Sequence, residues 1–294
     1  MLRFDILGPT LVLVGVPALV VSCDPSFAES RSREDVPPGS HRDGDRDAPE
    51  GGADDASSTG GGAVLGATLA LGRGQTCALL DDHSLKCWGE NRFGELGLGD
   101  TASRGDQPNE MGDALLAVEL GKGRSPVAIA AGGDHTCALL DDHSLKCWGK
   151  NNFGQLGLAD VKNRGVMPNE MGAALPAVDL GAGRSALAVT AGYGHTCALL
   201  DDHSVKCWGD GVYGQLGLGY QTETRGAVSG DALPTIDLGT GRSALAITSG
   251  SIHTCALLDD QSVKCWGWNS DGELGLGDRC HRARARRRCS LPSN

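Results

Sequence analysis

An internal repeat constrains the fold of this chain more than any other feature of its sequence. Four near-identical units of about 60 residues follow one another, and their first cysteines are Cys77, Cys137, Cys197 and Cys255. Each unit continues with a second cysteine in a Cys-Trp-Gly sequence and then with a Leu-Gly-Leu sequence. Regular self-similarity of this length is typical of folds that stack one structural unit on copies of itself.

Each unit contains four short apolar runs separated by turn residues. In the second unit these runs are residues 137–140, 145–148, 177–180 and 186–190. None is long enough to show a helical period, so the pattern predicts short antiparallel strands. Four such strands describe one blade of a β-propeller. We therefore predict an all-β fold of about four blades, with the repeats at residues 63–115, 116–175, 176–234 and 235–278.

The paired cysteines test this geometry. In the first unit, a three-residue hairpin loop at residues 81–83, with His83 in the left-handed conformation, places Cys77 opposite Cys87. At a non-hydrogen-bonded position of this kind the Cα atoms lie about 4.5 Å apart, and a disulfide tolerates roughly 4.4–6.8 Å. Each bridge closes a short loop and stabilises by roughly 3 kcal/mol. The predicted disulfides are Cys77–Cys87, Cys137–Cys147, Cys197–Cys207 and Cys255–Cys265.

Zinc ligation is the alternative for these cysteines. Zinc sites prefer cysteines two to four residues apart, whereas nine residues separate each pair here. We therefore predict no metal site and no cofactor. Disulfides form in oxidising compartments, so the pairing agrees with an exported protein.

The N-terminal segment is typical of an export signal. Residues 6–21 are mostly apolar, but they include two prolines and are too few to span a bilayer comfortably. The sequence at residues 20–23 resembles the bacterial lipobox, in which cleavage precedes a lipid-modified cysteine. We predict a signal peptide at residues 1–22 and lipidation of Cys23, with an ordinary cleaved signal or an uncleaved anchor as alternatives.

Two polar segments flank the repeats. Residues 23–62 are acidic and cannot bury enough apolar area to offset their ordering entropy, so we predict a disordered tether. Alternating aspartates at residues 43–47 also suggest a calcium loop, but the glycine and glutamate of that motif are missing. Residues 279–294 contain six arginines and no acid. We interpret them as an irregular tail, or a reading-frame change, that follows the last repeat; an anion- or nucleic-acid-binding tail is the alternative.

At three motifs the sequence resembles the repeat of the regulator of chromosome condensation family, in its exported bacterial branch. These are His-Thr-Cys-Ala-Leu-Leu at 253–258, Val-Lys-Cys-Trp-Gly at 263–267 and Gly-Gln-Leu-Gly-Leu-Gly at 214–219. The resemblance implies blades shaped for a ring of seven, so four blades would form an open arc. Such an incomplete propeller would expose an apolar face at each end, and exposed faces of this kind mark interfaces. We therefore also predict self-association.

The resemblance suggests guanine-nucleotide exchange as an activity. In the family that activity depends on a wedge inserted in one blade, and the uniform repeats here leave no such insertion. Exported propellers that resemble this repeat also include β-lactamase inhibitors, which act by binding alone. A binding-type inhibitor of an exported enzyme is therefore the main alternative function, and nucleotide exchange ranks below it.

Each unit also repeats residues that carry chemistry in other proteins, such as His135, Asp141, Asp142 and His143. They suggest an acid–base or metal site. However, an active site is needed once, and aspartates commonly satisfy the backbone of turns. We therefore predict structural roles and no enzymatic activity. The repeated tryptophans are predicted to pack between blades, and the repeated lysines, such as Lys146, to protect an outer strand edge.

A rim of loops is the predicted partner-binding surface, with local packing as the alternative for its residues. Its candidate residues are Phe93, Phe153, Tyr213, Glu95, Gln155 and Gln215. The net charge of −11 argues against nucleic acid as the partner. We predict a non-enzymatic cell-envelope lipoprotein that presents a β-propeller scaffold to an unknown protein partner. It would be exported and held at a membrane only through its lipid.

Overall fold

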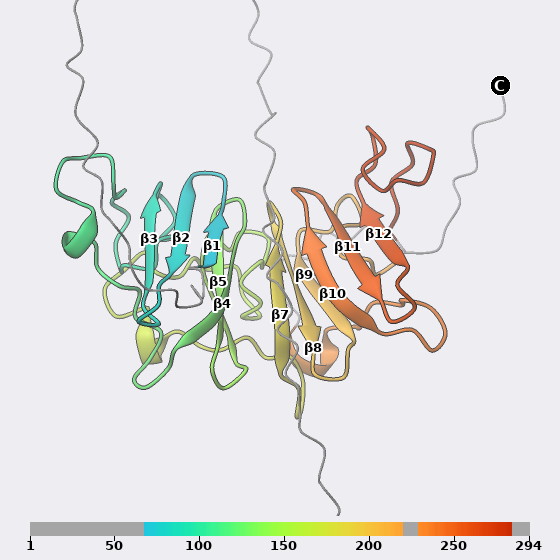
Figure 1. The fold of residues 1–294 in the computed structure, drawn as a ribbon, viewed down its shortest axis with the longest axis horizontal. Helices are drawn as coiled ribbons and strands as arrows, with labels where there is room; N and C mark the ends of the chain where they lie inside the picture. The colour runs from blue at the N-terminus through green and yellow to red at the C-terminus, as the bar shows by residue number, and fades with distance from the viewer. Residues whose placement is uncertain (1–67, 220–228, 284–294) are drawn as a thin grey trace, which may run out of the picture. The chain divides into compact units, whose positions relative to one another are not determined.

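The computed structural model describes residues 68–219 and 229–283. They form four antiparallel sheets of three strands each, shown in sequence order from the blue first sheet to the red fourth in Figure 1. The strands are β1 (Thr68–Leu71), β2 (Gln75–Leu79), β3 (Leu85–Gly89), β4 (Pro126–Ala131), β5 (His135–Leu140), β6 (Leu145–Gly149), β7 (Ala186–Ala191), β8 (His195–Leu200), β9 (Val205–Gly209), β10 (Ala244–Ser249), β11 (His253–Leu258) and β12 (Val263–Gly267). Three short 3-10 helices, η1 (Gly112–Ala114), η2 (Gly172–Ala174) and η3 (Gly230–Ala232), lie in the connections between the sheets.

The hairpin of each repeat has the predicted register. In the first repeat Cys77 pairs with Cys87 and Leu79 with Leu85, and the loop residue His83 is left-handed with a φ of 63°. The Cα atoms of the two cysteines are 4.1 Å apart, and their sulfur atoms are bonded. The other three predicted disulfides are present with the same Cα separation. Spacing alone therefore predicted these four crosslinks correctly.

The sheets contain three strands, not the four that the sequence predicts. The remaining predicted strand, residues 177–180, follows the outer edge of β6, where the Val178 amide donates to the Leu145 carbonyl at 2.7 Å. A carbonyl of this run accepts a hydrogen bond from a lysine on β9, because Lys206 Nζ donates to Leu180 O at 2.8 Å. The run is therefore an extended segment held partly by a side chain, and the lysine lies buried instead of exposed at an edge.

Successive sheets pack face to face and share apolar cores. β4 contacts β1 and β2, β7 contacts β4 and β5, and β10 contacts β7 and β8. Three of the four tryptophans predicted to pack between repeats, Trp148, Trp208 and Trp266, are buried in these cores, whereas Trp88 of the first repeat is in no such core and is only half-buried. The described repeats form an open arc and no closed ring, as expected for four blades.

Several sequence predictions concern residues that the structure does not describe. They are the signal peptide, lipidation of Cys23, the tether at residues 23–62 and the part of the arginine-rich segment at residues 284–294. In the part of the chain that is described, no helix is long and apolar enough to cross a membrane.

Candidate interaction surface

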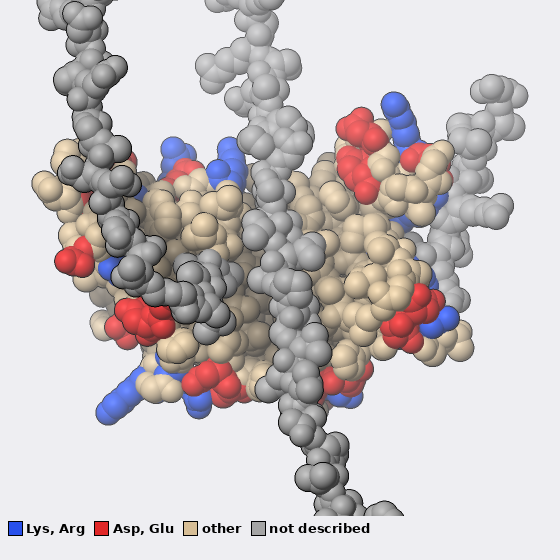
Figure 2. All heavy atoms as spheres, viewed as in Figure 1, with Lys and Arg blue, Asp and Glu red and all other residues tan. Residues whose placement is uncertain are grey.

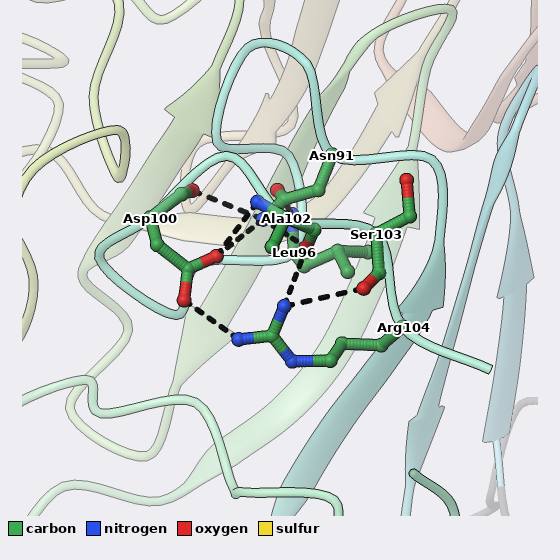
Figure 3. Close-up of polar contacts among 6 residues, drawn as sticks. All are labelled: Asn91, Leu96, Asp100, Ala102, Ser103 and Arg104. Carbon is green, nitrogen blue, oxygen red and sulfur yellow. Dashed lines mark hydrogen bonds and ion pairs between the residues drawn. The ribbon is translucent and has the colours of Figure 1, made fainter. Parts of the chain in front are cut away.

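A clasp of polar side chains shapes the loop after the third strand of the first repeat (Figure 3). Asn91 Nδ2 donates to the carbonyl oxygens of Asp100 and Ala102, both at 3.0 Å. Asn91 Oδ1 accepts from the Leu96 amide at 2.9 Å. Arg104 then pairs with the Asp100 carboxylate, with 2.6 Å between Nη2 and Oδ2. The buried Asn91 therefore bonds to backbone groups along the loop, and Arg104 adds an ion pair nearer the surface.

The clasp recurs in the second and fourth repeats. Its members there are Asn151, Asp160 and Arg164, and then Asn269, Asp278 and Arg282. The arginine backbone also bridges to the last residue of the third strand in each of these repeats. Sequence reasoning missed this device, although the spacing Asn-x8-Asp-x3-Arg appears three times and would have revealed it.

The clasp corrects the predicted end of the fourth repeat. We placed that end at Asp278 and assigned residues 279–294 to an irregular tail. Arg282 pairs with Asp278 and is buried, and its backbone exchanges two hydrogen bonds with Gly267. Cys280 is disulfide-bonded as well. The repeat therefore continues through residue 282, because Arg282, which the sequence interpretation assigned to the tail, is the clasp arginine of this repeat.

Three of the six predicted rim residues are not available to a partner. Glu95, Gln155 and Gln215 are at most 1% exposed. The side chain of Gln155 accepts from the Phe153 amide at 2.9 Å, within its own loop, and its carbonyl accepts from the next repeat. Glu95 and Gln215 bond in the same way. Burial raises the pKa of the Glu95 carboxyl. Their role is local packing, which was the alternative.

The three aromatic rim residues are half-buried and face the next repeat. The ammonium of Lys150 lies 4.5 Å from the ring centre of Phe93, a cation–π contact. Phe153 occupies the equivalent place beside Gly194, where a Cβ atom would lie 3.1 Å from its ring. Tyr213 meets Trp268 edge to face, with the ring centres 4.6 Å apart. The aromatic residue at this loop position therefore contacts a different group in each of these three repeats: an ammonium group, a glycine and an indole ring.

The third and fourth repeats share the largest aromatic cluster on this rim. Trp268 stacks on His281 with ring centres 4.2 Å apart, and Tyr213 stands edge-on to both rings. His281 Nδ1 accepts from the Asn269 amide at 2.9 Å, so the clasp fixes the orientation of the histidine. Tyr193 and Val212 are each 39% exposed and lie at the same end of the sheet, because β8 begins where β9 ends.

The repeated aspartates and the histidines that follow them lie in the hairpin turns at the opposite end of the strands. Asp142 Oδ1 accepts from both the hydroxyl and the amide of Ser144, and these bonds hold the pKa of Asp142 below its usual value. Arg124 pairs with Asp142 at 3.1 Å, and equivalent pairs recur in the next two repeats. Figure 2 shows charged side chains beyond both ends of the strands.

A second set of histidines runs through the buried edge between repeats. His135 Nε2 lies 2.8 Å from Thr196 Oγ1, and His195 Nε2 lies 2.9 Å from Thr254 Oγ1. Burial lowers the pKa of His135 to about 4 and that of His195 to about 3. Among the described residues, no group of three or more histidines, cysteines and carboxylates is placed to hold a metal ion.

Comparison with known proteins agrees with this architecture. Residues 82–139 and 142–199 match the Regulator of chromosome condensation (RCC1) repeat, and a second description of the same repeat matches residues 127–155, 187–215 and 245–273. The ultraviolet-B receptor UVR8 of Arabidopsis thaliana is 29% identical over 71% of this chain and 43% of its own length. The E3 ubiquitin-protein ligase HERC2 of Homo sapiens is 32% identical over 72% of this chain and 4% of its own length. The chain thus spans less than half of each relative.

Solved structures share the fold. Yeast RCC1 (Prp20), solved with Kap60 bound, has a TM-score of 0.59 and 23% identity, over 77% of this chain and 49% of that one. Human WBSCR16 has a TM-score of 0.58 and 20% identity, over 74% of this chain and 51% of that one. The repeat motifs, the stacked three-stranded sheets and these similarities agree: the chain belongs to the regulator of chromosome condensation repeat family.

Proposed function

We propose that this protein is a non-enzymatic, exported interaction scaffold that binds a protein partner through its aromatic rim. The observation that carries the proposal is the cluster of Tyr213, Trp268 and His281. The turn that carries Tyr213 has the same backbone hydrogen bonds as the turn that carries Phe153, yet the side chains that contact the two aromatic rings differ. Rigid aromatic groups on a fixed framework are typical of the residues that dominate protein interfaces.

The exposed neighbours of the cluster support a binding role. Tyr193 and Val212 add apolar area to the same end of the arc, and both are 39% exposed. The opposite end of the strands instead carries salt-bridged turns, in which Arg184 pairs with Asp201 and Asp202. Charged rims of this kind contribute little to binding energy. The aromatic end is therefore the better candidate for partner contact.

Export and lipid anchoring are part of the proposal. Four disulfides in four hairpins favour an oxidising compartment. The signal-like N-terminus and the lipobox-like sequence before Cys23 support a lipoprotein held at the cell envelope. Labelled fatty acid should be incorporated into the wild-type chain and not into Cys23→Ala; incorporation into both would contradict lipidation at this residue.

Affinity capture of envelope proteins tests the rim. The bait is the oxidised full chain, compared with a Tyr193→Ala, Val212→Ser, Trp268→Ala variant. Arg184→Ala, at the other end of the strands, is the matched control. We expect a specific partner to be retained by the wild type and the control and lost from the triple variant. A partner that binds all three equally would show that the rim is not the binding site.

A further inference from the structure

Each interface between neighbouring repeats is built from the same two halves. The repeat that comes first supplies its disulfide and three aliphatic side chains, such as Leu139, Leu145 and Leu156. The repeat that follows supplies an alanine, a leucine and a tryptophan, such as Leu200 and Trp208. The interface between the third and fourth repeats has equivalent residues in equivalent places, and the interface between the first and second repeats lacks only the counterpart of Leu139. We call the first half the disulfide face and the second half the tryptophan face.

The same pair of hydrogen bonds to one carbonyl recurs at all three interfaces. At the interface between the second and third repeats, the Gln155 carbonyl of the disulfide face accepts from Thr196 Oγ1 at 2.8 Å and from Trp208 Nε1 at 3.0 Å. The Glu95 and Gln215 carbonyls accept from the corresponding threonines and tryptophans at 2.9–3.1 Å. The interface therefore combines an apolar core with a fixed polar register.

Among the described residues, no repeat covers the disulfide face of the fourth repeat. Val263 is 63% exposed, whereas the residues at the same position in the other repeats, Leu85, Leu145 and Val205, are at most 1% exposed. Leu276 is 51% exposed. No described atom lies within 4 Å of a Cβ built on Gly272 or Gly275, although the equivalent glycines Gly94 and Gly97 touch the next repeat. Within the described residues, no side chain donates to the Glu273 carbonyl.

Among the described residues, no repeat covers the tryptophan face of the first repeat. Leu69 and Leu71 of β1 are 53% and 45% exposed, whereas Ala131, at the position of Leu71 in the second repeat, is 7% exposed. Trp88 and Thr76 occupy the positions of the interface donors Trp148 and Thr136. Across residues 68–219 and 229–283, neither side chain of this pair has a hydrogen-bond partner, and both are only half-buried.

We propose that a second copy of this chain docks its first repeat on the fourth repeat. The exposed apolar faces are the two halves of an interface that the chain already builds three times. Trp88 and Thr76 of one copy would donate to the Glu273 carbonyl of the other. The contact is head to tail, and such heterologous contacts form rings or longer assemblies. This inference concerns the ends of the arc and does not depend on the rim.

Sedimentation of the oxidised full chain over a range of concentrations tests the contact. Two variants each block one face: Val263→Glu on the fourth repeat and Leu69→Glu on the first. Both positions are more than half exposed, so neither charge has to be buried within a single chain. The control, Val161→Glu, changes a 49% exposed residue in the second repeat. Circular dichroism and mass mapping of the disulfides establish that all variants fold.

A head-to-tail contact predicts a distinctive mixing result. The wild type and Val161→Glu should associate as concentration rises, while Val263→Glu and Leu69→Glu should each remain monomeric. An equimolar mixture of the two blocked variants should form a dimer and no larger species, because each supplies the face that the other lacks. The proposal is overturned if the wild type stays monomeric, if either blocked variant self-associates as the wild type does, or if the mixture stays monomeric.

Discussion

The strands β6 and β9 are equivalent, but the loops that follow them contain different side chains. After β6, Asn151, Asp160 and Arg164 form the clasp. After β9, Gly211 stands where the asparagine would be, and Tyr220 stands where the aspartate would be. The hairpins that precede the two loops nevertheless have the same cysteine register.

This difference separates two levels of organisation in the repeat. The Gln155 and Gln215 carbonyls accept the same pair of inter-repeat hydrogen bonds, although only Gln155 follows a clasp asparagine. The disulfide hairpin and the core between repeats therefore set the sheet, and the clasp sets only the loop beyond it. Loops can then diverge without disturbing the arc, and Tyr213 of the aromatic cluster belongs to the loop whose sequence lacks the clasp.

Removing disulfides is expected to give the largest effect and tests whether the sheets are independent of the clasps. The Cys137→Ala, Cys147→Ala variant and the Cys197→Ala, Cys207→Ala variant should each lose about 3 kcal/mol of unfolding free energy. Both bridges are fully buried at the same place in their sheets, so the two losses should match. Urea denaturation without reductant measures them. A much smaller loss in the second repeat would show that the clasp also holds the sheet.

Acid should destabilise both repeats through their buried histidines. The lowered pKa values of His135 and His195, about 4 and about 3, mean that the unfolded chain binds protons first, near pH 6.5. The stability is fully present above pH 6.5 and is lost as pH falls towards the folded values. At pH 5 each histidine should account for about 2 kcal/mol.

Glutamine variants check this origin, since Gln75 occupies the same position in the first repeat. His135→Gln and His195→Gln should each reduce the difference in unfolding free energy between pH 7 and pH 5. The reductions should be alike, because both histidines belong to the sheets. An unchanged difference in both variants would rule the histidines out as its source.

The clasp asparagine should have a smaller effect that is confined to its loop. Asn151→Ala removes the acceptor of the buried Leu156 amide and the donor to Asp160, which should cost about 1–2 kcal/mol. Hydrogen exchange should quicken at the Leu156 amide and stay unchanged in the loop after β9. Asn152→Ala, at an exposed neighbour, is the control. Faster exchange across both repeats would contradict the separation of loop and sheet.

The outer half of the clasp should contribute least. Arg164 Nη2 lies 2.6 Å from Asp160 Oδ2, and the two side chains are 18% and 31% exposed. Arg164→Lys keeps the charge but loses the forked geometry, so we expect a loss below about 1 kcal/mol that shrinks in high salt. Thermal denaturation at two salt concentrations measures it. A larger, salt-independent loss would assign the arginine a packing role.

The predictability of each feature depends on how local its cause is. The register of the hairpins follows from a short loop and a fixed cysteine spacing, so Cys77–Cys87 and its equivalents were predicted to the residue. The number of strands per sheet was overestimated, because the backbone carbonyl of Leu180 bonds to a lysine side chain. Lys206 lies on β9, 26 residues further along the chain, so a strand pattern does not reveal this hydrogen bond.

The rim shows the same limit. Polar residues in a glycine-rich loop favour exposure, so Gln155 and Gln215 were predicted to face a partner. They are buried because the next repeat places its tryptophan on their carbonyls. The aromatic residues were assigned to the correct loops, but their neighbours were not. Trp268 and His281 come from the following repeat and from a segment interpreted as a tail.

Each of the four disulfides closes a hairpin within one repeat, and none of these four joins two repeats. If the chain is pulled from its ends, neighbouring sheets can separate without breaking a covalent bond. The hairpin loops between paired cysteines cannot lengthen, whereas the connections between sheets can. Under tension the repeats would then separate one at a time, and every separated repeat would keep a crosslinked hairpin from which to refold.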